Sequence, residues 1–384
     1  MPPSTVARRV RPTTPSPDVL VVGGGLIGCA LAWELAGAGA RVTVLERGRP
    51  GAEASSAAAG MLGPRAECDA PGPLLRLGTA SLALYRTFVE SLRDETGIDP
   101  EYQDDGILYV ALTNEEERLL ARRARWQRQA GFAVETLSAR AARGLEPLVC
   151  DDVRSGVRFA DDHRLDNVRL TRAVAVAAAG RGVTLRAGTP VAAIRCRGGR
   201  AVAAETQGGP VVAGAIVNSA GAWAGALAPA HSTVPVRPVR GQMVTLTVAR
   251  APFRHAIYSR GVYLVPRRDG RVLAGSTYEE AGYDARVTGA GLSGIVARAL
   301  RLAPVLGDAR FETAWAGLRP GTPDTLPILG RDPAVRGLFY ATGHYRHGIL
   351  LAPVTARALR ELVLDGRTSY DLGPFALARF ARRP

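Results

Sequence analysis

The sequence predicts an α/β protein in which a Rossmann-type dinucleotide-binding domain is joined to a second domain of α+β type with an antiparallel sheet. Three observations support this prediction. A glycine-rich loop connects a short valine-rich run to a helical pattern near the start of the chain. Further short apolar runs and helical patterns recur in the middle and near the end. Between them lie strand-like segments with a hairpin turn, which are typical of antiparallel sheets.

The first elements form a β-α-β unit. Residues 18–22 are a valine-rich run of the kind found in buried parallel strands. The pattern predicts a helix over residues 26–38, which ends at Gly39, and a second strand over residues 41–45.

The rest of the chain alternates helical and strand-like segments. Apolar residues at three- and four-residue spacing predict helices, and short apolar runs predict strands. The predicted helices cover residues 77–95, 114–131, 167–179, 290–303 and 349–364. The predicted strands cover residues 106–112, 183–185, 191–194, 211–218, 234–248, 256–266, 271–276 and 337–341, with a hairpin turn at Arg268-Asp269-Gly270.

The length of 384 residues exceeds one average domain and indicates two. Because the nucleotide-binding elements are dispersed along the chain, we expect both domains to be discontinuous. Residues 1–17 are rich in Pro, Ser, Thr and Arg, lack a long apolar core and are expected to form a disordered tail. The dinucleotide-binding domain is expected to contain residues 18–75, 148–235 and 312–370, and the substrate domain residues 76–147 and 236–311.

The basic charge of the chain comes from arginine alone. The net charge is +14, aromatic residues make up only 6%, and the arginines are scattered without a binding motif, so we expect no nucleic-acid partner. No stretch reaches the roughly 18 apolar residues that span a bilayer, so we expect no membrane partner. The four cysteines form no CxxC pair and have no ligand partners nearby, which predicts no metal site. A disulfide framework is not expected in so long a chain, which predicts a cytoplasmic protein.

The glycine-rich loop has the spacing Gly23-x-Gly25-x-x-Gly28. The first glycine allows a tight turn, the second lets the backbone approach a pyrophosphate, and the third lets the helix pack against the strand. The helix N-terminus offers free N–H groups and a positive dipole end to the phosphates. Glu46 follows the second strand and can accept both ribose hydroxyl protons. A dinucleotide is therefore expected, and the loop alone leaves FAD and NAD open.

Three further motifs choose between these cofactors. Residues 55–63 have the sequence SSAAAGMLG and are followed by Ala66-Glu67-Cys68. Residues 315–322 have WAGLRPGT, and residues 343–353 have GHYRHGILLAP. Together these motifs closely resemble the glycine oxidase branch, of the thiamine pathway, in the D-amino-acid oxidase and sarcosine oxidase family of flavoproteins. The resemblance runs from about residue 18 to residue 365 and is far more specific than the glycine loop.

The resemblance implies non-covalent FAD and a set of cofactor contacts. The phosphate loop would contribute Gly23, Gly25, Leu26, Ile27 and Gly28, and the adenosine end Glu46 and Arg47. The other implied contacts are Ala54, Ser55, Ala59, Gly60, Met61, the backbone of Val191, and the stretch of His344, Tyr345, Arg346, His347, Gly348, Ile349 and Leu350 beside the flavin ring.

The resemblance also implies three substrate contacts. Arg319 matches the carboxylate-binding arginine of the family, Arg346 a second substrate-contacting position, and Tyr263 an active-site tyrosine. A pair between Arg319 and a carboxylate would be bidentate and charge-assisted. The alternatives are that Arg346 acts through its backbone and that Tyr263 only packs in its strand. The sequence departs from the family pattern at Gly261, where relatives carry histidine, and at His347, where they carry asparagine, and both positions bear on substrate range.

The implied reaction is oxidative deamination of glycine, with sarcosine and small D-amino acids as secondary substrates. A hydride leaves the α-carbon for flavin N5, so the protein mainly positions the substrate and excludes water. O2 then reoxidises the flavin and gives H2O2. The imine gives glyoxylate and ammonia or is handed to thiazole synthase. The family also implies homo-oligomers, commonly tetramers.

Several alternative hypotheses stay open. One is a sarcosine or D-amino-acid oxidase, and another is a dehydrogenase that passes electrons to a quinone. Covalent sarcosine oxidases use a cysteine in the C-terminal part, and this chain has none after Cys196. A flavin-binding subunit without catalysis would not need the carboxylate-binding arginine. The sequence leaves open the preferred substrate, the electron acceptor and the oligomer size.

Overall fold

The computed structural model describes residues 16–229, 232–248 and 252–381. Its first layer is a six-stranded sheet in which β1 pairs in parallel with β2 on one side and β12 on the other. Only β18 runs antiparallel to its neighbour. In spatial order the strands are β18 (Ile328–Arg331), β19 (Leu338–Thr342), β12 (Ala215–Asn218), β1 (Val19–Val22), β2 (Val42–Leu45) and β8 (Thr184–Arg186).

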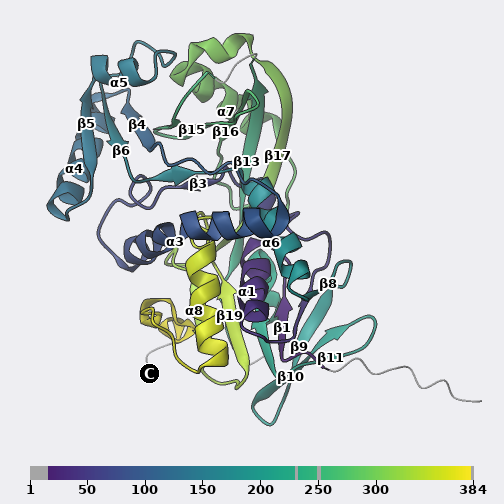
Figure 1. The fold of residues 1–384 in the computed structure, drawn as a ribbon. Coiled ribbons are helices and arrows are strands. Elements are labelled where there is room, and N and C mark those ends of the chain that lie inside the picture. The colour runs from purple at the N-terminus through teal and green to yellow at the C-terminus, as the bar shows by residue number, and fades with distance from the viewer. Residues whose placement is uncertain (1–15, 230–231, 249–251, 382–384) are drawn as a thin grey trace, which may run out of the picture.

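Four helices pack on this sheet and on one another (Figure 1). They are α1 (Leu26–Gly37), α3 (Pro73–Thr96), α6 (Asn167–Gly180) and α8 (Ala352–Leu364). α1 is apolar on nearly all sides because it lies between the sheet, α6 and α8. α6 begins at Asp166, whose carboxylate accepts the backbone N–H groups of Val168 and Arg169, and such a cap stabilises a helix by about 1 kcal/mol.

The second layer is an eight-stranded, mostly antiparallel sheet, drawn in the upper part of Figure 1. In spatial order its strands are β17 (Arg310–Gly321), β13 (Arg237–Thr247), β16 (Arg271–Gly275), β15 (Val262–Pro266), β14 (Ala256–Ser259), β4 (Ile107–Ala111), β6 (Ser155–Phe159) and β5 (Val134–Ser138). Its helices are α4 (Asn114–Gln129), α5 (Ala139–Leu145) and α7 (Gly289–Leu302). A second buried apolar cluster lies between this sheet and α7.

Short elements complete the described chain. β9 (Val191–Arg197), β10 (Arg200–Thr206) and β11 (Val211–Val212) form a three-stranded sheet, and β3 (Met61–Leu62) pairs with β7 (His163–Arg164). The remaining segments are α2 (Ala54–Ala57) and the 3-10 helices η1 (Gly221–Leu227), η2 (Pro304–Asp308), η3 (Gly373–Phe375) and η4 (Leu377–Phe380).

The predicted fold class is confirmed, because a parallel sheet with its β-α-β start stands beside an antiparallel sheet. The strands differ from the prediction in two ways, because two predicted runs are divided and seven observed strands were not expected, namely β3, β5, β6, β7, β10, β17 and β18. The run over residues 211–218 is divided between β11 and β12, which belong to different sheets. The run over residues 256–266 turns at Gly261, whose φ is +80°. No strand was expected over residues 310–321, where β17 pairs with β13, because exposed residues are followed there by small residues, glycine and proline.

Three elements lie outside the domain that the sequence assigned to them. β17 falls almost entirely in a segment expected for dinucleotide binding, yet it pairs with β13 in the eight-stranded sheet. β6 falls in a segment expected for dinucleotide binding, yet it pairs with β4 and β5 in the eight-stranded sheet. α3 falls mostly in a segment expected for the substrate domain, yet it packs on α6 and α8. Its Tyr85 and Phe88 belong to the same buried cluster as Val21 of β1. The division into two discontinuous domains stays a prediction, with these elements exchanged between its parts.

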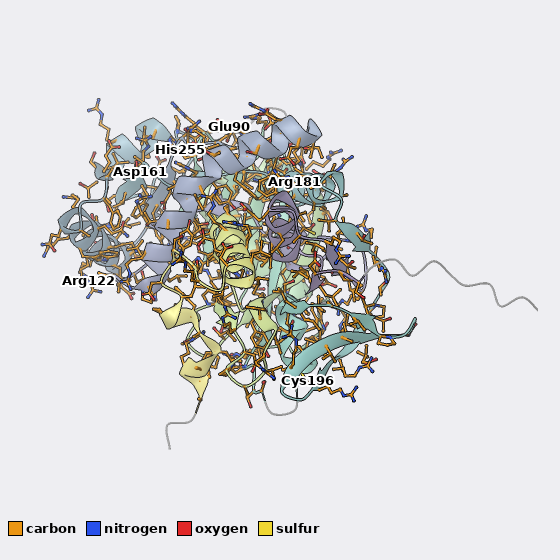
Figure 2. All side chains as sticks on the ribbon, turned by 60° about the horizontal axis from the view of Figure 1, so that its bottom comes forward. Glu90, Arg122, Asp161, Arg181, Cys196 and His255 are labelled. Atoms are coloured by element: carbon orange, nitrogen blue, oxygen red, sulfur yellow. The ribbon has the colours of Figure 1, made fainter. Side chains whose placement is uncertain are left out.

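The sequence also predicted scattered arginines, an N-terminal tail and no membrane-spanning segment. Figure 2 labels Arg122 on α4 and Arg181 after α6 on separate parts of the molecule, in line with scattered arginines. Most of the expected tail, residues 1–15, lies outside the described residues. None of the helices in the described part of the chain combines the length and apolar character needed to cross a bilayer.

Candidate active site

A cavity of about 640 Å³ runs from the carboxyl end of β1 to the face of the eight-stranded sheet. Most residues expected to bind cofactor or substrate line it, although they come from distant parts of the chain. The lining members of that set are Gly23, Gly25, Leu26, Ile27, Glu46, Arg47, Ala54, Ser55, Ala59, Gly60, Met61, Val191, Tyr263, Arg319, His344, Tyr345, Arg346, Gly348 and Ile349.

Gly28, His347 and Leu350 do not line the cavity. Leu350 lies in the buried apolar core, and His347 turns toward Glu67. Gly28 lies inside α1, where a Cβ atom would approach the carbonyl oxygen of Gly23 to 2.0 Å. Its role is therefore close packing of the helix on the loop, which the sequence analysis had assigned to the third glycine.

The phosphate loop closes tightly around the N-terminus of α1. Gly23 has a φ of +106°, and a Cβ atom there would lie 2.5 Å from the carbonyl oxygen of Ser219. No side chain caps the helix from its N-cap residue, and Ser55 Oγ accepts the N–H of Leu26 at 2.9 Å. The first-turn amides and the small residues around them form a cradle suited to a pyrophosphate.

Glu46 is fixed at one end of the cavity by backbone amides. Its Oε2 accepts the N–H of Gly24 at 2.8 Å, and its Oε1 accepts the N–H of Gly48 at 2.8 Å. The neighbouring Arg47 guanidinium lies 3.4 Å from the centroid of the Trp223 ring. Trp223 also lines the cavity, so this end offers a fixed carboxylate and a flat aromatic wall.

Small residues of α2 and β3 form the middle of the wall and are held from outside by larger ones. Asn167 Nδ2 donates to the carbonyl oxygens of Ser55 at 2.9 Å and Ser56 at 3.1 Å. The indole N–H of Trp315 donates to the carbonyl of Ala57 at 3.1 Å. Arg267 Nη2 donates to the carbonyl of Ala59 at 3.0 Å. The wall is therefore rigid although its own side chains are short.

Arg319 extends from β17 into the cavity. Its Nη2 donates to Ser276 Oγ at 2.7 Å and its Nη1 to the carbonyl of Thr277 at 3.2 Å. Gly241 on the paired strand leaves the room, since a Cβ atom there would lie 2.2 Å from the guanidinium nitrogens. Among the described residues no carboxylate lies within 4.0 Å of this guanidinium. Arg319 therefore has charge and hydrogen-bonding capacity left for an anion.

Tyr263 lies beside Arg319 on the cavity wall, and its hydroxyl faces Met243 Sδ at 3.0 Å. Burial raises the pKa of Tyr263, and the charge of Arg319 opposes this only in part. The phenol is thus protonated at neutral pH. Its single proton is donated to the weak acceptor Met243 Sδ and can turn to a stronger acceptor in the cavity.

A buried carboxylate that the sequence analysis gave no role stands behind Arg346. Glu67 Oε1 lies 3.7 Å from Arg346 Nη2, Glu67 Oε2 lies 3.2 Å from His347 Nδ1, and the Tyr258 hydroxyl donates to Glu67. Burial by itself would raise the pKa of Glu67, but Arg346, His347 and Tyr258 lower it to about 2. The only signal in the sequence was an acidic residue inside an otherwise apolar motif.

His344 points away from solvent toward α8. Its Nε2 pairs with Thr355 Oγ1 at 3.1 Å. Burial, with a smaller contribution from the charge of His347, lowers the pKa of His344 to about 3. Its imidazole is therefore neutral at physiological pH. The next residue, Tyr345, has a φ of +50° and packs edge-on against Tyr278.

Comparison with known proteins decides what this cavity holds. A family model described as FAD-dependent oxidoreductase matches residues 18–362. The chain belongs to this family. The prediction that the chain is a flavoprotein of this kind is thereby confirmed. The cofactor of this FAD-dependent oxidoreductase is FAD. The fixed Glu46, the amide cradle and the wall of small residues form a site that suits this dinucleotide.

Similarity to individual relatives extends over nearly the whole of this FAD-dependent oxidoreductase. Glycine oxidase from Geobacillus kaustophilus is 38% identical over 94% of the chain and 97% of the relative. Its crystal structure superposes with a TM-score of 0.92 over 94% of this chain and 98% of that one. The bifunctional protein ThiO/ThiG of Synechocystis is 40% identical, but the chain covers only 54% of it. Iminodiacetate oxidase from Chelativorans sp. BNC1 is 30% identical, with a TM-score of 0.84 over 93% of this chain and 98% of that one.

Proposed function

We propose that this FAD-dependent oxidoreductase oxidises glycine, and sarcosine and small D-amino acids more slowly. The observation that carries the proposal is the position of Arg319, whose guanidinium lines the cavity and donates to two neutral acceptors. Among the residues that the structure describes, no carboxylate lies within 4.0 Å of it. A small carboxylate would satisfy its remaining donors. The glycine oxidase of Geobacillus kaustophilus, at 38% identity over 94% of the chain, supports glycine as that ligand.

The proposed roles of the residues follow from their positions. Arg319 would bind the substrate carboxylate, Tyr263 would donate a hydrogen bond, and Arg346 would complete the wall beside them. The phosphate loop, Glu46 and the segment from Ala54 to Met61 would hold non-covalent FAD. When bound, FAD supplies the acceptor for the two electrons that leave the substrate α-carbon. The protein fixes the orientation of a zwitterion and excludes water from it.

Atoms balance in a simple way. Glycine loses two electrons and two protons and becomes the imine, O2 takes up two electrons and two protons and becomes H2O2, and water converts the imine to glyoxylate and ammonia. The bifunctional ThiO/ThiG relative supports transfer of the imine to a thiazole synthase as its alternative fate. A homotetramer in the cytoplasm is part of the same proposal. The tetramer follows the resemblance alone, and the cytoplasm follows the cysteine content of the chain.

The competing candidates are a sarcosine or D-amino-acid oxidase and a quinone-linked dehydrogenase. The test is an absorbance scan of the purified protein, anaerobic mixing with glycine, and a peroxide assay with glycine, sarcosine, D-alanine and D-proline. We expect a yellow protein that glycine bleaches and the highest kcat/KM for glycine. A colourless preparation, a protein that stays yellow with excess glycine, or glycine as the poorest substrate would each overturn the proposal. Turnover only with a quinone would identify the dehydrogenase.

A further inference from the structure

Three arginines reach the substrate end of the cavity, and their electrostatic surroundings differ. No carboxylate in the described part of the chain lies within 4.0 Å of the Arg319 guanidinium. Arg346 faces Glu67 at 3.7 Å, and Arg123 forms an ion pair with Asp69. All five groups line the same cavity. The two acids cancel two of the three guanidinium charges, so one positive charge remains in excess at this end.

The carboxylates of the two ion pairs differ in their exposure to solvent. The side chain of Asp69 is 84% exposed, and solvent screens such a carboxylate strongly. The side chain of Glu67 is only 9% exposed and has three partners. Its low pKa, near 2, keeps it ionised throughout the neutral range. Glu67 is therefore the persistent negative charge beside the cavity.

The guanidiniums of Arg319 and Arg346 line the same cavity as the phenol of Tyr263. Burial raises the pKa of Tyr263, and the charges of both arginines act against this rise. A ligand carboxylate on Arg319 thus lies within the electrostatic reach of Arg346. A second anionic group on that ligand would meet Arg346 together with the carboxylate behind it.

We propose that Glu67 is a specificity-determining residue that cancels the charge of Arg346 and so restricts the pocket to substrates with a single carboxylate. The proposal rests on the proposed function, in which a small amino acid binds through Arg319. It names the excluded class as amino acids with a second anionic group, for example glycine that carries a carboxymethyl group on its nitrogen. Glu67 does not touch the reacting atoms in this account and acts through Arg346.

Removal of the negative charge of Glu67 should weaken the discrimination against substrates with a second anionic group. In Glu67→Gln the amide keeps the size and the hydrogen bond from Tyr258 but leaves Arg346 uncompensated. Because the Arg346 side chain is 45% exposed, solvent screens part of its uncompensated charge. At an effective dielectric constant of about 20, the remaining interaction is enough for a change of roughly tenfold in relative affinity. We therefore expect the ratio of kcat/KM for iminodiacetate to that for glycine to rise roughly tenfold in the variant.

A binding experiment gives the same answer without turnover. Acetate and malonate differ by one carboxylate, and each is titrated into the FAD-loaded protein while the flavin absorbance spectrum is recorded. The wild-type protein should bind malonate no more than about threefold tighter than acetate despite its three arginines. Glu67→Gln should raise this preference roughly tenfold.

Three variants separate charge from structure. Glu67→Asp keeps the charge and should stay near the wild-type ratios. Tyr258→Phe removes a hydrogen bond to the same carboxylate without a change of charge and should shift the ratios by less than about twofold. Asp69→Asn makes the same change of charge at the exposed pair, so solvent screening should keep its shift below about threefold.

Each outcome decides the matter. Unchanged ratios in FAD-loaded Glu67→Gln, or an equal shift in Tyr258→Phe, overturn the proposal. If Glu67→Gln does not retain FAD, the wild-type titration decides, because malonate bound more than about tenfold tighter than acetate contradicts a cancelled charge. Failure of the wild-type protein to oxidise glycine refutes the proposed function instead, while the acetate and malonate titrations still report on the second charge.

Discussion

The two ends of the cavity are built in different ways. The end at β1 is formed mainly by backbone amides and glycines of about one β-α-β unit, from Gly23 to Gly48, with the Glu46 carboxylate held by two of these amides. The end at the eight-stranded sheet is formed mainly by polar and charged side chains from five separate segments, with Glu67, Arg123, Tyr263, Arg319 and Arg346 as its main members. A backbone site depends on shape, and a side-chain site depends on cancellation of charge. The two ends should therefore fail differently when they are mutated.

The largest effect is expected at the side-chain end. Arg319→Ala should lower kcat/KM for glycine, and the loss of transition-state stabilisation should be about 2–5 kcal/mol. The reason is that the substrate carboxylate would lose its partner in a cavity away from solvent. FAD content should not change, since Arg319 holds no part of the backbone cradle. Steady-state kinetics and the ratio of flavin to protein absorbance measure both quantities. Arg319→Lys keeps the charge but not the planar fork and should recover only part of the activity. Unchanged glycine kinetics in Arg319→Ala would refute the assigned role.

A shape change should have the opposite signature at the backbone end. In Gly23→Ala the new Cβ atom would lie 2.5 Å from the carbonyl of Ser219, with φ at +106°. We expect a loss of about 3 kcal/mol in stability or FAD affinity from overpacking and backbone strain together. Gly39→Ala is the matched control, because its φ is +89° but no atom lies within 4 Å of the added Cβ. Equal FAD affinity in the two variants would show that the cradle does not need the close approach.

The same contrast explains what the sequence could predict. The spacing of Gly23, Gly25 and Gly28 with Glu46 is local, so the phosphate loop and its cavity position followed from the printed chain. The contacts of Glu67 were missed, because its partners Tyr258 and His347 are brought beside it only by folding. β17 was missed as a strand although it carries Arg319, because its pairing with β13 overrides a weak local pattern. His347 and Leu350 were expected beside the flavin, and the helical turn that leads into α8 points them elsewhere.

A pH experiment tests His344, a buried histidine that lines the cavity and pairs with Thr355 of α8. The folded pKa of His344, about 3, lies below its ordinary value of 6.5. The unfolded chain therefore binds the proton more tightly, and the stability from neutral His344 is present above pH 6.5 and is lost as the pH falls toward 3. Between about pH 8 and about pH 5 the free energy of unfolding should fall by about 2 kcal/mol through this residue. Urea unfolding at several pH values should show a flatter dependence in His344→Gln, and an identical slope would contradict the assignment.

The smallest expected effect concerns the aromatic wall at the adenosine end. Trp223 packs on Arg47 at 3.4 Å and stacks on Tyr283, so it adds an aromatic side chain to a region formed mainly by backbone. Trp223→Ala should weaken FAD binding by about 1 kcal/mol, because a cation–π contact and a flat surface are lost while the phosphate cradle stays intact. Trp223→Phe keeps a ring and should recover about half of that loss. Titration of the apoprotein with FAD measures both. A loss as large as that in Gly23→Ala would mean that side chains, and not backbone shape, dominate this end too.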